Sequence, residues 1–252
     1  GWTADGQAFF VLTNERDPRT FDLYRYSARD YARALVFQND EALQVEAVSP
    51  DGRYVAMVKP RTSADSNLYL LDMQAADAKP RLITPHTGNV NHGTFNFTRD
   101  SRQLAYATDE HGEFTQAWTY DVTDGRKAPL IAASWDVSFV SFSESGRYRI
   151  SGTNDDARTV VRIFDRDTGK EITLPGLPPG DLSQVKFSRD EKRVALRVSS
   201  DTSPADVYVE GTSPDINGRV RPYRAYLCAE HAEMLAEDGV RFRSPVNGDP
   251  VF

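Results

Sequence analysis

Cysteine is nearly absent from this sequence: its 252 residues include one, Cys228. A disulfide within the chain needs a second cysteine and a thiolate-rich metal site needs several, so the sequence excludes both. Long hydrophobic runs are also missing, because no stretch reaches the roughly 20 apolar residues of a membrane-spanning helix. The start at Gly1 lacks a methionine and a basic-then-apolar signal segment, so we expect a soluble chain that is mature or trimmed.

Acidic residues outnumber basic residues, 37 to 30. The formal net charge is -7, and no cluster of lysine and arginine could follow a phosphate backbone. Nucleic acid and anionic membranes are therefore not expected as partners. Hydrophobic residues make up 39% and charged residues 27% of the chain, as in ordinary globular proteins. We expect the chain to fold.

The motifs of several enzyme and ligand-binding classes are missing. No Gly-x-Ser-x-Gly pentapeptide occurs, although the nucleophilic serine of an α/β-hydrolase needs this sharp turn between strand and helix. A glycine-rich phosphate loop is missing too, and the Asp/Gly turns lack the ligand spacing of an EF-hand. We therefore expect no catalytic residue, no metal site and no cofactor in this chain.

Two of the four histidines, His86 and His92, lie six residues apart in one expected loop. The loop could bring their imidazoles together, but the spacing matches no standard zinc signature and no third ligand is evident. The pattern favours two exposed or capping histidines over a metal site.

A repeat of 45 to 49 residues runs through most of the chain. Its marker is a polar residue in a turn motif, at Asp5, Asp51, Asp100, Ser145 and Asp190, which are 46, 49, 45 and 45 residues apart. Within a repeat, short runs of β-branched and aromatic residues alternate with turn residues, which is typical of strands. The second repeat predicts strands at 44–49, 53–58, 68–72 and 80–84.

Four strands per repeat, arranged radially, make a β-propeller. The sequence therefore predicts an all-β fold, a propeller of five four-stranded blades over residues 1–211. We expect the three tryptophans, Trp2, Trp118 and Trp135, to pack between blades, because aromatic side chains contribute heavily to β cores.

The pattern fails after Gly211. Residues 212–252 are expected to form an irregular C-terminal segment with a short helix at 227–237 and a hairpin that turns at Asn247-Gly248.

The repeats resemble the prolyl oligopeptidase family of serine peptidases, in particular its bacterial acylaminoacyl-peptidase or dipeptidyl-aminopeptidase-like branch. The resemblance covers roughly residues 1–209. It rests on these segments: Trp2-Thr3-Ala4-Asp5-Gly6, Asp22-Leu23-Tyr24-Arg25-Tyr26, Val58-Lys59-Pro60-Arg61-Thr62, Leu82-Ile83-Thr84-Pro85-His86 and Leu174-Pro175-Gly176-Leu177-Pro178.

The resemblance implies a seven-bladed propeller ahead of an α/β-hydrolase domain. The five repeats would then be the last five of seven, with unpaired strand edges at both ends of the arc. We expect either that the blades re-close into a five-blade ring or that the edges pair in a homodimer. Residues 212–252 would lead toward the hydrolase domain, and the compartment could be bacterial cytoplasm or periplasm.

The loops between second and third strands are rich in acids, and loops on a rigid scaffold often carry binding residues. Our candidates for contact with a peptide substrate's amino group or the hydrolase domain are Glu15, Arg16, Asp109, Glu110 and Asp155. Ordinary solvated loop charge is the competing interpretation.

Three functional hypotheses follow. The first is a non-catalytic propeller that gates or binds peptide substrates and packs on the hydrolase domain of a serine peptidase. The second is a free-standing TolB-like propeller for protein–protein interaction. The third is a five-bladed glycosidase or lyase with acids converging on a central channel.

Overall fold

The computed structural model describes residues 1–174, 180–211, 223–225, 242–243 and 250–251. All regular structure in these residues is β-strand, which confirms the predicted fold class. The chain divides into a first unit, residues 1–142, and a second unit, residues 143–252. Within the described part, no helix is long and apolar enough to cross a membrane.

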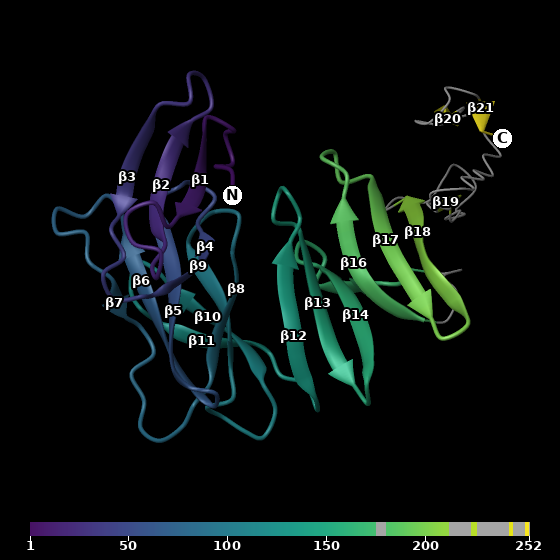
Figure 1. The fold of residues 1–252 in the computed structure, drawn as a ribbon. Coiled ribbons are helices and arrows are strands. Elements are labelled where there is room, and N and C mark those ends of the chain that lie inside the picture. The colour runs from purple at the N-terminus through teal and green to yellow at the C-terminus, as the bar shows by residue number, and fades with distance from the viewer. Residues whose placement is uncertain (175–179, 212–222, 226–241, 244–249, 252) are drawn as a thin grey trace. The chain divides into compact units, whose positions relative to one another are not determined.

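The first unit contains three antiparallel sheets in which strands adjacent in the chain are neighbours (Figure 1). Its strands are β1 (Ala8–Thr13), β2 (Asp22–Ser27), β3 (Arg33–Phe37), β4 (Gln44–Val48), β5 (Tyr54–Thr62), β6 (Asp65–Asp72), β7 (Arg81–Leu82), β8 (His92–Phe97), β9 (Gln103–Thr108), β10 (Gln116–Asp121), β11 (Lys127–Ile131) and β12 (Asp136–Phe142). The sheets are β1-β2-β3, β4-β5-β6-β7 and β8-β9-β10-β11.

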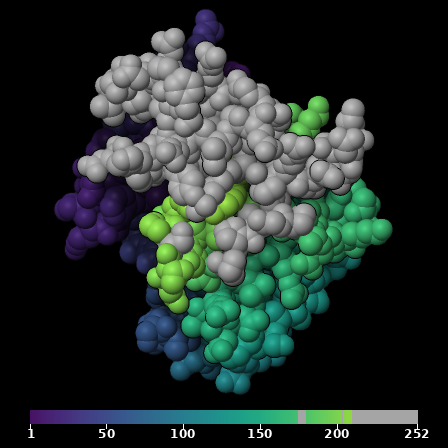
Figure 2. Space-filling view, turned by 90° about the vertical axis from the view of Figure 1, so that its right-hand side faces the viewer, coloured from purple at the N-terminus to yellow at the C-terminus, as the bar shows by residue number. Residues whose placement is uncertain are grey.

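The second unit follows the same plan: its sheets are antiparallel, and strands adjacent in the chain are neighbours. Figure 2 shows part of the surface of its described residues, in green to yellow-green. Its strands are β13 (Tyr148–Asp155), β14 (Arg158–Asp165), β15 (Lys170–Ile172), β16 (Asp181–Phe187), β17 (Arg193–Ser200), β18 (Ser203–Gly211), β19 (Tyr223–Ala225), β20 (Phe242–Arg243) and β21 (Pro250–Val251). Strands β13 to β15 pair in order, as do β16 to β19. Strands β20 and β21 pair through Phe242 and Val251, as expected for the predicted hairpin.

The first sheet differs from the predicted four strands. It has three, and an isolated bridge between Trp2 and Phe9 lies along β1, where the other sheets have their first strand. The Phe10 amide donates to the Gly1 carbonyl at 2.7 Å, so residues 1–3 cover part of this edge. The predicted helix at 227–237 lies outside the described residues.

The repeated turn explains why the marker residues recur. In the repeats whose marker is aspartate, Ser or Thr donates its hydroxyl to the carboxylate two residues later, as Thr3 does to Asp5 at 2.6 Å and Ser188 to Asp190 at 2.6 Å. The next residue has a positive φ, which favours glycine, and Gly52 has φ 71°.

Two repeats place a larger residue in this left-handed position. Ser101 has φ 59° and Glu191 has φ 55°. The Ser101 hydroxyl accepts from the Asp51 amide at 3.0 Å, and the Glu191 carboxylate accepts from the Ser145 amide at 2.7 Å. Each side chain thus joins its turn to the turn of the preceding repeat, which offsets the backbone strain.

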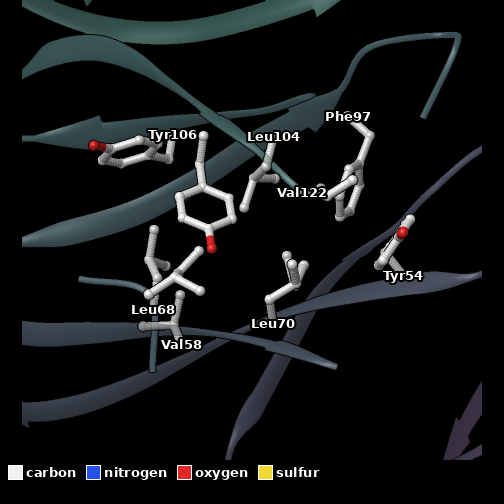
Figure 3. Close-up of a cluster of buried hydrophobic side chains, with 11 residues drawn as sticks. Tyr54, Val58, Leu68, Leu70, Phe97, Leu104, Tyr106 and Val122 are labelled. Carbon is white, nitrogen blue, oxygen red and sulfur yellow. The ribbon is translucent and has the colours of Figure 1, made fainter. Parts of the chain in front are cut away.

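The core of the first unit lies between its sheets. Val55, Met57 and Leu71 of the second sheet pack with Phe10 and Leu23 of the first. The opposite face of the second sheet packs on the third, as the cluster in Figure 3 shows. The labelled members of that cluster are Tyr54, Val58, Leu68, Leu70, Phe97, Leu104, Tyr106 and Val122. The second sheet is therefore buried on both faces, which explains its nearly continuous apolar strands.

Candidate functional site

The candidate site of the first unit is the sheet end where β5 turns into β6, β7 connects to β8, and β9 connects to β10. Hydrogen bonds donated by backbone amides join these three connections. The Ser66 amide donates to the Val90 carbonyl at 3.0 Å, and the Asn91 amide donates to the Asp109 carboxylate at 2.7 Å. The three connections therefore form one hydrogen-bonded surface.

Asp109 and Glu110, predicted as binding residues, both lie on this surface. The Asp109 carboxylate is occupied by the Asn91 amide, so it holds the β7–β8 connection against the β9–β10 connection. The Glu110 side chain is 32% exposed, and its Oε2 lies 3.7 Å from Nε2 of His92. Of the two carboxylates, Glu110 is the one more open to a partner.

Glu15 and Arg16 lie in the β1–β2 connection and are both in ion pairs. The Glu15 carboxylate accepts two hydrogen bonds from Arg33, at 2.9 and 3.0 Å, and these bonds lower the pKa of Glu15. Arg16 donates to both carboxylate oxygens of Asp22, at 2.7 and 2.8 Å. These contacts give both residues a structural role.

Asp155 belongs to the second unit, at the end of β13. It is exposed and pairs in register with Arg158 across a two-residue turn formed by Asp156 and Ala157. Their φ values, 48° and 62°, are those of a type I′ hairpin turn. The turn presents the Asp155 carboxylate to solvent.

His86 and His92 are not exposed, so that part of the sequence interpretation is wrong. Their side chains are 2% and 0% exposed, and their ring centroids are 5.0 Å apart. Each ring caps a carbonyl: Nδ1 of His86 contacts Thr84 at 2.9 Å, and Nδ1 of His92 contacts Ser66 at 3.0 Å. Packing buries these two side chains, although Thr87, Gly88 and Asn89 between them are exposed.

Asp65 and Ser66, at the start of β6, were missed by the sequence analysis. The Asp65 carboxylate accepts from Nε2 of His86 at 2.9 Å. The Ser66 hydroxyl donates to the His92 carbonyl at 2.6 Å and accepts from the His92 amide at 2.7 Å. The available signal was a polar pair at the head of an apolar strand, since buried polar groups require partners.

The two imidazoles have opposite electrostatic environments. Burial by itself lowers the pKa of His86, but hydrogen bonds to Thr84 and Asp65 outweigh it and raise that pKa above 6.5. Burial lowers the pKa of His92 below 6.5; the bond to Ser66 opposes this shift, and the neighbouring His86 adds to it. His86 therefore takes up a proton before His92.

No group of three histidine, cysteine, aspartate or glutamate side chains in the described residues is arranged to hold a metal ion. What the surface offers is hydrogen bonding, negative charge and aromatic contact. The aromatic part is Phe114 beside Trp135, with ring centroids 5.4 Å apart, and His111 beside Trp118 at 4.2 Å.

The tryptophans fit the packing expectation only in part. Trp118 packs against the cluster between the second and third sheets. Trp135 and Trp2 are 39% and 66% exposed, so these two rings remain available for contact.

Comparison with known families gives a match over most of the chain. The model described as the prolyl oligopeptidase, N-terminal beta-propeller domain, matches residues 1–214. None of the curated proteins matches the chain.

Solved structures with the same fold include TolB proteins and prolyl oligopeptidases. TolB from Acinetobacter baumannii aligns with 88% of this chain and 52% of its own, at 18% identity and a TM-score of 0.57. Prolyl oligopeptidase B from Galerina marginata, bound to a 35mer hydrolysis and macrocyclization substrate, aligns with 99% of this chain and 36% of its own. Its identity is 14% and its TM-score 0.66. The chain thus spans about half the TolB and a third of the oligopeptidase.

Proposed function

Since the chain belongs to the N-terminal β-propeller family of the prolyl oligopeptidases, we propose that it is the non-catalytic propeller part of a longer serine peptidase. In that protein it would pack on an α/β-hydrolase domain and gate or bind peptide substrates. The observation that carries the proposal is the family match over residues 1–214, together with repeated antiparallel sheets of the same fold. The missing Gly-x-Ser-x-Gly motif agrees with catalysis in another part of the protein.

A fluorophosphonate probe, which labels activated serines, tests this function. We expect the full-length protein encoded by the gene to be labelled and to hydrolyse a short fluorogenic peptide, whereas the 252-residue chain remains unlabelled. Labelling should disappear when the serine of the hydrolase domain is changed to alanine. A folded full-length protein that takes up no label would contradict the proposal.

That negative result would favour the second candidate, a TolB-like propeller that binds another protein. The observation in its favour is that an Agrobacterium tumefaciens protein assigned as TolB aligns with 88% of this chain and 78% of its own length. Its identity is 17% and its TM-score 0.58, so the likeness concerns the fold alone.

Among the predicted binding residues, we propose that Glu110 and Asp155 contact the substrate's amino group or the hydrolase domain. Glu15, Arg16 and Asp109 are held by contacts within the propeller, whereas Asp155 is exposed and Glu110 is 32% exposed. An exposed carboxylate keeps its charge for a cationic partner at little desolvation cost.

Glu110→Gln and Asp155→Asn are each expected to raise KM for a peptide with a free amino terminus, with kcat nearly unchanged. The expected rise is about fivefold at most, the range of one exposed ion pair. Glu171→Gln is the control, because Glu171 is 56% exposed on β15, outside the candidate loops. An equal KM for all three variants and the parent protein would remove these two residues from the site.

A further inference from the structure

His92 is fixed in place while one of its ring nitrogens is left without a partner. Its amide and carbonyl both bond the Ser66 hydroxyl, and its Nδ1 donates to the Ser66 carbonyl at 3.0 Å. That bond requires the proton of the neutral ring on Nδ1. Nε2 is then a buried acceptor, and it has no hydrogen-bond partner among the described residues.

Glu110 is the carboxylate closest to this free nitrogen. Its Oε2 lies 3.7 Å from Nε2, beyond hydrogen-bonding range but close enough that a small loop movement would join them. A neutral Nε2 and a carboxylate are both acceptors and cannot bond. One added proton makes Nε2 a donor.

His86 and His92 are expected to respond differently to protonation, because their ring nitrogens face different partners. Nδ1 of His86 faces a carbonyl and Nε2 faces the Asp65 carboxylate, so both nitrogens are placed to donate, as in an imidazolium. Asp65 is 6% exposed and is also 3.3 Å from Arg61. His86 already has partners for both of its protons, whereas His92 has a partner for one and a waiting carboxylate for the other.

We propose that the His92–Glu110 pair is a pH-sensitive contact, in which protonation of Nε2 draws Glu110 into a hydrogen bond and orders the β9–β10 connection. That connection carries Asp109 and Glu110, so acidification would change how a predicted binding loop is presented. The inference concerns the loop itself and does not require that the parent protein be a peptidase.

The groups facing His92 come from four sides. These are His86 from the β7–β8 connection, Tyr106 from β9, Glu110 from the connection after β9, and Lys127 from β11. Arg61 and Asp65, from β5 and β6, act on His86. The cations His86 and Lys127 disfavour a charged His92 and Glu110 favours it. Removing Glu110 therefore removes a negative charge that favours the proton.

The two histidines contribute to stability in opposite pH ranges. The pKa of His86 is raised on folding, so its contribution is complete below 6.5 and is lost as pH rises through its folded pKa. The pKa of His92 is lowered on folding, so its contribution is complete above 6.5 and is lost as pH falls through its folded pKa. The Glu110 contact recovers part of the stability that His92 loses in acid.

The first test is an NMR titration of the histidine ring signals in the 252-residue chain. We expect the His92 signal to titrate below 6.5, and Glu110→Gln to weaken its proton affinity by about tenfold, as loss of a nearby opposite charge does. Glu113→Gln, a change of an exposed acid in the same loop, is the matched control and should leave His92 unchanged. Equal His92 titrations in parent, Glu110→Gln and Glu113→Gln proteins would overturn the proposal.

The second test measures amide hydrogen exchange of residues 109–115 at pH 5 and pH 7.5, corrected for intrinsic rates. We expect protection to rise at pH 5 in the parent and in Glu113→Gln, and not in Glu110→Gln or His92→Asn. The asparagine side chain of His92→Asn can still donate to the Ser66 carbonyl, and Glu110→Gln leaves the bond between His92 and Ser66 intact. Because two different variants are used, a folding defect in one of them does not decide the test. Equal acid protection in Glu110→Gln would show that the contact does not order the loop.

Discussion

Leu104→Ala is expected to lower the free energy of unfolding of the first unit by about 3 kcal/mol, the typical cost of emptying a buried leucine site. Leu104 lies on β9, is 0% exposed and belongs to the cluster between the second and third sheets (Figure 3). Neighbours on both sheets hold the cavity open, so the site collapses only in part. The loss combines the hydrophobic free energy that the removed methyl groups contributed by being buried with the cost of the cavity that remains.

Urea denaturation followed by tryptophan fluorescence measures this effect, because Trp2, Trp118 and Trp135 all lie in the first unit. Trp118 packs against the cluster itself. Leu82→Ala on β7 is the matched control, since Leu82 is 38% exposed and its truncation should cost well under half as much. Equal losses for the two leucines would mean that the second and third sheets do not pack as described.

Asp22→Ala is expected to lower the free energy of unfolding by about 2 kcal/mol, because it leaves the buried Asn39 amide without an acceptor and removes the ion pair with Arg16. The Asp22 side chain is 2% exposed and accepts bonds from Arg16 and from the Asn39 amide at 2.8 Å. Asn39 in turn bonds the amide and carbonyl of Leu43 just before β4. The substitution therefore loosens the connection between the first and second sheets.

The pH dependence of this effect has a definite sign. Hydrogen bonds from Arg16 lower the pKa of Asp22; burial opposes them, and the Asn39 amide adds to the lowering. A lowered pKa gives stability that is present above 3.8 and lost as pH falls through the folded value. The stability difference between Asp22→Ala and the parent should therefore narrow below pH 3.8.

Asp40→Ala is the control for Asp22→Ala. Asp40 also pairs with Arg16, at 3.2 Å, but its side chain is 65% exposed and solvent replaces the lost contact. Its midpoint in urea should match that of the parent. If Asp22→Ala also matched the parent, the Asp22 network would not hold the two sheets together.

The repeat was predictable because its signals are local. Ser49, Asp51 and Gly52 form their turn through bonds and backbone angles within a few residues, and the same pattern recurs in the other repeats. The three-stranded first sheet follows from the same repeat: only Gly1 and Trp2 stand ahead of the Thr3 turn, where the second repeat has Gln44–Val48. These two residues form a bridge and hydrogen bonds to β1 and no further strand. The predicted domain division at 211 and 212 stays a prediction.

The candidate site was predictable in part. The acidic composition of the loops pointed to Asp109, Glu110 and Asp155, but it gave no indication that Asp109 accepts the Asn91 amide. Glu15 and Arg16 looked like free charges because their partners, Arg33 and Asp22, lie 18 and 6 residues further along the chain. Side-chain charge is visible in a sequence, whereas the partner that neutralises it depends on packing.

The sequence by itself determined an all-β chain of five repeats, since turn residues and strand periodicity are local signals that span only a few residues. Only the tertiary structure decided the burial of His86 and His92, the free Nε2 of His92 and the nearby Glu110. The physical reason is sequence separation: Ser66 and His92 are 26 residues apart, and the packing of one sheet on the next brings them into contact. Burial and partner geometry, which set the protonation of these groups, are properties of that packing.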